Sequence, residues 1–264
     1  MGPQATETRT LTDEVRDYWE AGSCGTDRTE AAKFSRAYFA EIEEFRYRHE
    51  PFIHQFAQFT RYRGKTVLEV GVGAGTDFVQ WNRAGALAHG VDLTDEAIEH
   101  VRHRLALEGL AATDLRRCNA EHLPYPDDFF DLAYSWGVIH HAENTPAVLR
   151  EIVRVTKPGG RVKLMVYNAH SVETLRLWLT HGAWRGASPA WVLARYQESP
   201  GTKAYTPRSF RELLKGIPHH DYRVWYWDQY LRTGARARWL RQAATSLMPA
   251  WTRWFLAIEF VKGP

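Results

Sequence analysis

Between residues 65 and 168 the chain alternates short apolar runs with segments in which apolar residues recur every three or four positions. A short run rich in β-branched residues is typical of a strand buried on both faces, and the wider spacing is typical of an amphipathic helix. The expected strands cover residues 65–71, 86–91, 114–118, 129–136 and 161–167, and the expected helices cover 76–83, 94 onward and 145–156. This order predicts a doubly wound, mostly parallel α/β sheet with right-handed crossovers.

The two ends of the chain follow other patterns. A short helix is expected over residues 11–19 and a longer helical pattern over 29–59, broken near Pro51. After residue 168 a Trp-rich helical segment is expected at 171–196 and a helix from Thr206 to 214, with Pro207 at its first position. Strands at 221–230 and 254–261 flank a basic helical piece at 235–247.

Composition narrows the possible classes of protein. The net charge of +3 is too small to indicate nucleic acid or an anionic membrane as a partner. Only Cys24 and Cys118 are present, which fits a reducing cytoplasm, and no apolar run approaches the ~20 residues of a membrane span or a secretion signal. Most of the 11 Trp lie late in the chain, where they fit either an apolar pocket wall or thick core packing.

The candidate chemistry begins with a glycine-rich turn after the first strand. Gly71, Gly73 and Gly75 alternate there, and a second strand ends in Asp92 about 20 residues on, the spacing at which an acid meets ribose hydroxyls. A dinucleotide fingerprint requires G-x-G-x-x-G, but the sixth position here is Thr76. The alternate glycines, with Glu69 before them, resemble the first motif of class I S-adenosylmethionine-dependent methyltransferases.

That resemblance covers residues 65–168 and implies a Rossmann-like sheet whose last strand is antiparallel. It also implies a helical lid at 1–60, a methyltransferase domain at 61–264 and a cap insertion at about 170–205. The cofactor would be S-adenosylmethionine (SAM) and its product S-adenosylhomocysteine (SAH). The residues that the resemblance assigns to the cofactor are Glu69, Gly71, Gly73, Gly75, Thr76, Asp92, Leu93, Asn119, Ala120, Ser135 and Trp136.

Two further segments resemble family motifs. The segment that begins at Asn119-Ala120 continues to Leu123-Pro124-Tyr125 and is similar to D-A-x-x-L-P-F, so Asn119 would accept from the adenine amino group. Strand four is followed by His140 and His141, as in small-molecule methyltransferases that place a histidine pair beside the transferring methyl. We expect His141 to face the methyl more often, and His140 to pack or bond to backbone. Neighbouring histidines without a suitably spaced third ligand are a weak zinc signature, so no metal is assigned.

These patterns predict methyl transfer to a small-molecule or peptide acceptor, through oxygen or nitrogen, in secondary metabolism. Some sugar O-methyltransferases of this family pair the histidine with an aspartate in strand five, but residues 163–168 contain no acid. Two alternatives remain: a non-enzymatic sensor or scaffold that binds the cofactor, and an NAD-dependent short-chain oxidoreductase, which the missing Tyr-x-x-x-Lys pair disfavours. The residues expected to contact the acceptor are Tyr38, Tyr167, Asn168, Trp178, Trp184 and Trp191.

Overall fold

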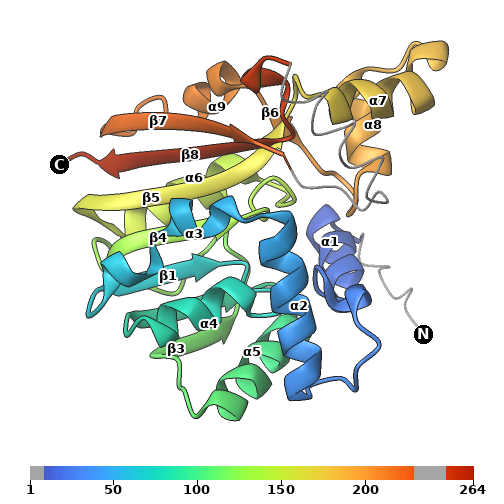
Figure 1. Ribbon diagram of the computed structural model, residues 1–264. Coiled ribbons are helices and arrows are strands. Elements are labelled where there is room, and N and C mark those ends of the chain that lie inside the picture. The colour runs from blue at the N-terminus through green and yellow to red at the C-terminus, as the bar shows by residue number, and fades with distance from the viewer. Residues whose placement is uncertain (1–8, 229–247) are drawn as a thin grey trace, which may run out of the picture.

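The computed structural model describes residues 9–228 and 248–264 and is built on one mixed sheet. Its strands follow the order β3-β2-β1-β4-β5-β8-β7, and a short β6 pairs with the end of β5. Figure 1 shows the sheet from β3 at the bottom to β7 at the top. The strands are β1 (Thr66–Val70), β2 (Leu87–Asp92), β3 (Asp114–Arg117), β4 (Phe130–Trp136), β5 (Thr156–Asn168), β6 (Ala204–Tyr205), β7 (His219–Trp227) and β8 (Phe255–Lys262).

The central strands are buried on both faces, which explains their continuous apolar runs. In β4, Leu132, Tyr134 and Trp136 join one buried cluster, while Phe130 and Ala133 join the cluster on the opposite face. Helices α4 (Thr76–Arg83), α5 (Asp95–Glu108) and α6 (Thr145–Val155) follow β1, β2 and β4. The predicted doubly wound α/β arrangement is confirmed.

The order of the strands reverses between β1 and β4. In open α/β sheets a crevice forms at such a switch point, outside the carboxyl ends of the strands. Three N-terminal helices, α1 (Leu11–Glu20), α2 (Arg36–His49) and α3 (Phe52–Ala57), lie near this region of the molecule, and α1 and α2 stand beside the strand ends (Figure 1). Helix α2 ends ahead of Pro51, as expected, because the residue before a proline is disfavoured in a helix.

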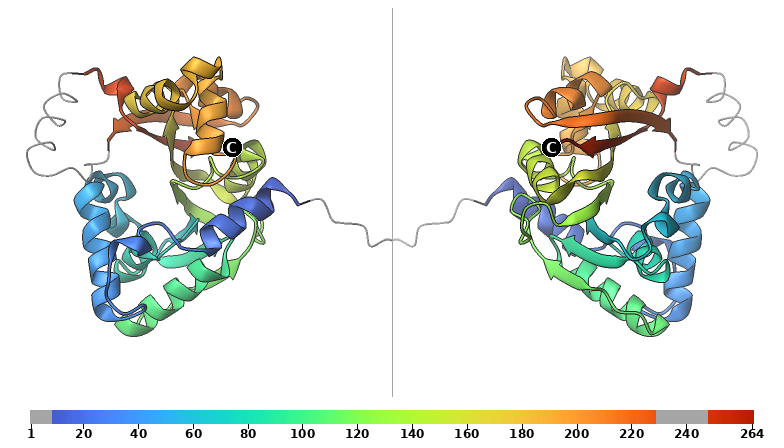
Figure 2. Two further views of the ribbon diagram at one scale, coloured as in Figure 1. Left: turned by 90° about the vertical axis from the view of Figure 1, so that its right-hand side faces the viewer. Right: turned by 90° about the vertical axis from the view of Figure 1, so that its left-hand side faces the viewer.

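The C-terminal part contributes a helical hairpin and the antiparallel strands. Helices α7 (Val172–His181) and α8 (Pro189–Tyr196) pack on each other above the same end of the sheet, and α9 (Pro207–Leu213) precedes β7. Figure 2 gives the two side views, with α1 and α2 below this hairpin. Strand β8 runs antiparallel to both β5 and β7, which confirms the predicted antiparallel pairing. The basic piece expected at 235–247 lies outside the described residues.

One local difference from the sequence-based expectation has a simple cause. Strand β5 begins at Thr156 rather than at 161, because Thr156 pairs with Phe130 before a register shift brings Arg161 opposite Leu132. The expected turn at Pro158-Gly159-Gly160 is therefore an irregularity within a longer strand. The helical segment at 171–196 is interrupted at Gly182, Gly186 and Pro189, as the sequence indicates, because the two glycines flank a short 3-10 turn and Pro189 begins α8. In the described part of the chain, no helix has the length and apolarity needed to cross a membrane.

Candidate active site

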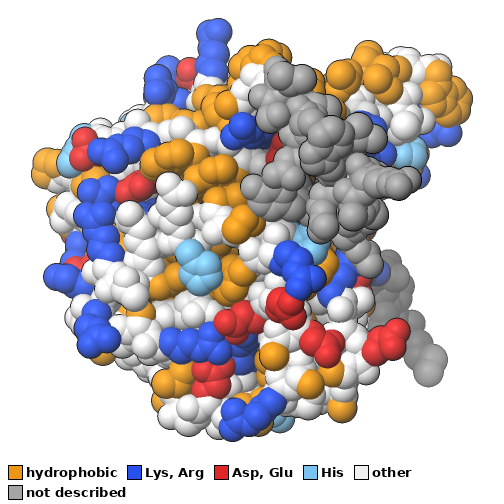
Figure 3. Space-filling model, viewed as in Figure 1, with side chains coloured by type: hydrophobic (Ala, Val, Ile, Leu, Met, Phe, Trp, Pro, Cys, Tyr) orange, Lys and Arg blue, Asp and Glu red, His pale blue; other side chains and the backbone are white. Residues whose placement is uncertain are grey.

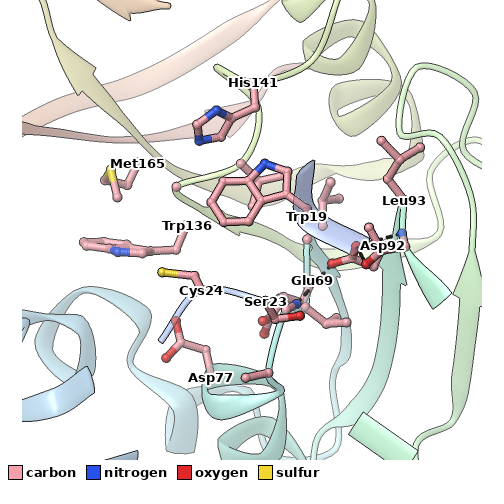
Figure 4. A pocket seen from close by; sticks show the side chains of 18 of the residues that line it. Trp19, Ser23, Cys24, Glu69, Asp77, Asp92, Leu93, Trp136, His141 and Met165 are labelled. Atoms are coloured by element: carbon pink, nitrogen blue, oxygen red, sulfur yellow. Dashed lines mark hydrogen bonds between the residues drawn. The ribbon is translucent and has the colours of Figure 1, made fainter. Parts of the chain in front are cut away.

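A cavity of about 470 Å³ lies at the carboxyl ends of the central strands, within the range of small-molecule and cofactor sites. Its floor includes Gly71 after β1, Asp92 at the end of β2 and Trp136 at the end of β4. Its cover includes Trp19 from α1 and Arg46 from α2. Figure 4 shows Asp92 and Leu93 at one end, Met165 and Trp136 at the other, and Trp19 between them below His141.

Glycine is needed at each of the three positions of the turn, and the physical reason differs between them. All three adopt positive φ, which favours glycine. A Cβ on Gly73 would meet nothing within 4 Å, so its backbone borders open cavity space, where a ligand can approach closely. A Cβ on Gly71 would lie 2.2 Å from Val138, and one on Gly75 would lie 3.0 Å from Val101 of α5. Gly75 does not line the cavity, so its assignment to the cofactor is corrected to a role in packing α4 against α5.

Asp92 is held in place by backbone and side-chain donors. Its Oδ2 accepts the Gly73 N–H at 3.1 Å, and its Oδ1 accepts both the N–H and the hydroxyl of Thr94, at 3.1 and 2.8 Å. Burial raises the pKa of Asp92, while these hydrogen bonds act in the opposite direction. A carboxylate fixed at the edge of a cavity, beside exposed glycine backbone, is suited to adjacent hydroxyl donors such as those of a ribose.

Glu69 and Asp77 place two carboxyl groups beneath the glycine turn. Glu69 is 3% exposed, and its Oε2 accepts the indole N–H of Trp81 at 2.7 Å. Burial, and then the like charge of Asp77, raise the pKa of Glu69 well above its ordinary value. Asp77 accepts hydroxyl donors from Tyr134 and Tyr47 at 2.9 and 3.1 Å. This end of the cavity is therefore suited to a cationic group.

Arg46 of α2, a residue of the helical lid that the sequence predicts over the cofactor, forms an ion pair with one of these acids. Its guanidinium lies 3.2 Å from Asp77 and 3.6 Å from Glu50, and Glu50 accepts the indole N–H of Trp136 at 2.7 Å. The Nε of Arg46 is buried without a hydrogen-bond partner. Because a buried guanidinium N–H requires an acceptor, this atom leaves the site able to bind an anionic group such as a carboxylate.

The cavity continues beyond Asp92 along the residues that follow β2 and β3. Leu93, Asn119 and Ala120 line it, as expected for an adenine site. Oδ1 of Asn119 accepts the N–H of Glu121 at 3.0 Å, so Asn119 also caps its own turn. Ser135 does not line the cavity: it is fully buried, and its hydroxyl donates to the Val70 carbonyl at 2.9 Å. The assignment of Ser135 to the cofactor is corrected to a link between β4 and β1.

The histidine pair is divided between the cavity wall and the core. His141 lines the cavity beside Tyr167, and its ring lies edge-on to Trp19 at 5.3 Å between centroids. His140 is 0% exposed and packs 4.1 Å from the Tyr167 ring, and neither of its nitrogens has a hydrogen-bond partner. Burial, with His141 and Lys203 nearby, lowers the pKa of His140 well below its ordinary value. His140 therefore stays neutral, and His141 is the histidine that borders the cavity.

A carboxylate does approach His141, although strand β5 supplies none. Oε2 of Glu198, which follows α8, lies 3.4 Å from Nε2 of His141 and accepts the hydroxyl of Tyr167 at 2.6 Å. Both Glu198 and Tyr167 line the cavity. This contact could not be predicted from the sequence, because a helical hairpin separates Glu198 from His141 along the chain.

Five residues expected to contact the acceptor lie outside this cavity. Their side chains have other partners: the Tyr38 hydroxyl pairs with His100 at 2.8 Å, and Asn168 donates to two carbonyls after β7. The Trp178 indole donates to the Ala187 carbonyl at 2.8 Å. On the projecting α7–α8 hairpin, where hydrophobic side chains gather in Figure 3, Trp184 and Trp191 are 69% and 43% exposed. The predicted contact with the acceptor is therefore corrected for Tyr38, Asn168, Trp178, Trp184 and Trp191, which do not line this cavity.

The comparisons with known proteins agree with this geometry. Residues 68–164 match the family model of the methyltransferase domain. Residues 68–164 thus carry a methyltransferase domain, and the fold around it is similar to that of SAM-dependent methyltransferases. This methyltransferase domain spans the glycine turn, Asp92, Asn119 and the histidine pair.

Curated relatives extend the comparison over part of the chain. A malonyl-[acyl-carrier protein] O-methyltransferase of Halorhodospira halophila is 36% identical over 131 residues, covering 47% of this chain and 40% of that protein. Methyltransferase GfsG of Streptomyces halstedii is 36% identical over 106 residues, covering 38% of this chain and 37% of that protein. The matched region thus spans about 40% of the length of these relatives.

A solved structure shows the same fold over a larger share of the chain. The YcgJ protein of Bacillus subtilis superposes with a TM-score of 0.58 at 18% identity, covering 82% of this chain and 100% of that protein. The family's cofactor is SAM. The residues present fit that group, because Gly73 borders open space, Asp92 offers an acceptor at the cavity edge and Nε of Arg46 lacks an acceptor.

Proposed function

We propose that this chain transfers a methyl group from SAM to an oxygen or nitrogen atom of a small-molecule or peptide acceptor, in secondary metabolism. One observation carries the proposal: a single cavity joins the Asp92 and Gly73 end to a chamber bordered by His141, Tyr167 and Met165. A cofactor held at the first end would present its reactive group to the second. The wall of that chamber is largely aromatic and apolar, which favours an acceptor with an organic body rather than a fully hydrated ion.

Each part of the cofactor has a group in this chain that fits it. Glu69 is placed for the amino group of the methionine part and Arg46 for its carboxylate. Asp92 is placed for the ribose hydroxyls. Leu93 and Ala120 would pack against adenine, and Asn119 would accept from its amino group. These roles follow from the positions of the side chains in one cavity together with the family resemblance.

When bound, SAM supplies an activated methyl group, so the carbon–sulfur bond breaks as the acceptor–carbon bond forms and sulfur keeps the electron pair. The chain must then align the acceptor, exclude water and receive the proton that a hydroxyl or ammonium acceptor loses. His141 is placed for the last task, because it borders the chamber and its Nε2 has no hydrogen-bond partner. Trp19 covers the imidazole and helps to exclude water.

The proposal is tested by methyl transfer from radiolabelled SAM to a panel of hydroxy, amino and carboxylic acid compounds. We expect label in a compound of the panel. His141→Ala should lower kcat by about 10²–10⁴-fold and leave SAH affinity unchanged, the range for loss of a general base.

The matched control is His103→Ala, because His103 is half exposed on α5 and does not line the cavity. SAH binding with no labelled product from any acceptor would favour the sensor or scaffold alternative. Binding of NAD in place of SAH, measured by calorimetry, would favour the oxidoreductase. Full activity of His141→Ala would leave His141 a purely structural residue.

A further inference from the structure

The turn after α8 brings two consecutive residues onto the two nitrogens of His141. Glu198 faces Nε2 at 3.4 Å, and the hydroxyl of Ser199 lies 2.8 Å from Nδ1. Glu198 adopts a left-handed backbone conformation, with φ of 53°, which L side chains rarely take up. A residue other than glycine is costly at such a position, and strain of this kind gathers at functional sites. The strained backbone at Glu198 is therefore a reason to consider a functional role for its carboxylate.

Two hydroxyl groups, those of Ser199 and Thr202, lie within hydrogen-bond distance of Nδ1 of His141. The Thr202 hydroxyl lies 3.0 Å from Nδ1 and donates to the Ser199 carbonyl at 2.6 Å. Since a hydroxyl has one proton, the oxygen of Thr202 can only accept from Nδ1–H. In the tautomer in which Nδ1–H donates to Thr202, the lone pair of the neutral imidazole is on Nε2, the nitrogen that faces Glu198.

Access from the cavity differs between the two groups. Nε2 of His141 is buried and has no hydrogen-bond partner, and the His141 side chain is 5% exposed. The Glu198 side chain is 33% exposed and lines the cavity. A molecule in the chamber therefore meets the carboxylate before it meets the imidazole nitrogen. The other titratable groups near Glu198 are Tyr167, Tyr18 and Cys24.

We propose that Glu198 is a catalytic residue that contacts the acceptor and passes its proton to Nε2 of His141, an inference that rests on the proposed function. The proton leaves the acceptor atom for a carboxylate oxygen of Glu198 and then moves to Nε2. His141 becomes an imidazolium, and Glu198 returns to its anionic form beside it. The hydroxyl of Tyr167 holds the carboxylate in place through the 2.6 Å hydrogen bond.

This arrangement also balances charge in a part of the cavity with little water. The transfer removes the positive charge of the sulfonium and creates one on the imidazole. An anion 3.4 Å from Nε2 stabilises that new charge, and a low local dielectric strengthens the effect. A His141 ring without Glu198 would have only the hydroxyls at Nδ1 to support it.

A binding experiment tests the position of Glu198 without any acceptor. Sinefungin is a SAM analogue in which a carbon bearing an amino group replaces the methylated sulfur, so its cation occupies the region of the transferring methyl. We expect Glu198→Gln to weaken sinefungin at least tenfold in calorimetry and to change SAH affinity less than twofold, because only sinefungin has the added cation. Glu198→Asp should restore part of the difference.

Glu173→Gln is the matched control, because Glu173 is on α7 of the same hairpin and pairs with Arg176 at the surface. Equal sinefungin affinities in Glu198→Gln and the wild type would overturn the inference. If the wild-type protein does not bind SAH, the proposed function is contradicted instead. A variant that fails to fold is recognised by its circular dichroism, and Glu198→Asp then carries the comparison.

The transfer of the proton is tested by turnover with an acceptor found in the labelling experiment. Glu198→Gln should lower kcat at least about 100-fold with little change in cofactor KM. The double variant with His141→Gln should lose no more than the larger single loss, because residues that act in series are not additive. Losses that multiply would show that Glu198 and His141 act separately and would overturn the relay.

Discussion

Replacing Glu69 by Gln should stabilise the empty protein and weaken its cofactor binding at the same time. Glu69 lies near the end of β1, accepts a hydrogen bond from the indole of Trp81 and faces the carboxyl group of Asp77. Glutamine has nearly the same volume and keeps an oxygen for the indole. The substitution thus removes a buried charge and leaves the packing unchanged.

The sign of the stability effect follows from the raised pKa of Glu69. A carboxyl whose pKa is higher in the folded state binds more protons there than in the unfolded chain, so stability falls as pH rises from the ordinary carboxyl pKa through the raised value. Glu69→Gln removes this fall. At pH 8 we expect the variant to be more stable by about 1–3 kcal/mol, the cost of an incompletely satisfied buried group. For a chain of this size that is a rise in Tm of about 2–4 °C per kcal/mol.

The effect on binding has the opposite sign. If Glu69 meets the amino group of the methionine part, its loss removes a charge-assisted hydrogen bond of about 1.5–3 kcal/mol, or roughly 10–150-fold in Kd. Thermal unfolding at pH 4.5 and pH 8, with and without SAH, and calorimetry measure both effects. Glu173→Gln is the surface control. A variant that is less stable at pH 8 and binds SAH as tightly as the wild type would refute the reasoning.

Two further predictions concern the rest of the cofactor end. Gly73→Ala should cost the empty protein only about 1–2 kcal/mol, the strain of a left-handed residue, yet weaken SAH at least tenfold, since its Cβ enters open cavity space. Gly71→Ala should cost more, because its Cβ would lie 2.2 Å from Val138; equal unfolding free energies for the two variants would contradict this. Asp92→Asn should weaken SAH by roughly 2–3 kcal/mol in calorimetry, and an unchanged Kd would place the ribose elsewhere.

The central sheet could be predicted from the sequence because its physical constraints are local. A strand buried on both faces requires a continuous apolar run, as at Thr66–Val70, and the turn that follows requires positive φ at Gly71, Gly73 and Gly75. The position of the Asp92 carboxylate could be predicted from its spacing after that turn alone. These features lie within about 25 residues, so one stretch of sequence contains the whole argument.

The acceptor end depends on contacts between distant segments, and its residues could not be predicted in the same way. Glu198 follows α8 and does not lie in a motif. At the cofactor end, Arg46 is likewise on a distant helix, α2. Some late tryptophans are predicted to contact the acceptor and do not line the cavity, because amphipathicity alone does not say which face of a helix is buried. Trp184 is at the surface, whereas Trp227 stacks on Phe52 of α3 at 4.9 Å and helps to pack that helix against the sheet.

The contacts of the two helices that cover the cavity, α1 and α2, indicate which of them costs less to open. Helix α1 buries one side chain, Val15, and is held mainly by exposed hydrogen bonds, from Thr12 to Glu143 and from the start of α5 to Glu20. Helix α2 instead buries three side chains, and its Arg46 joins the acidic cluster under the glycine turn. Exposed hydrogen bonds and little apolar burial make a segment the least costly to open. Leu11 of α1 packs on Gly201, three residues after Glu198, so α1 also contacts the turn that carries the carboxylate near His141. One weakly held helix therefore both covers the cavity and contacts the turn at its proton-accepting end.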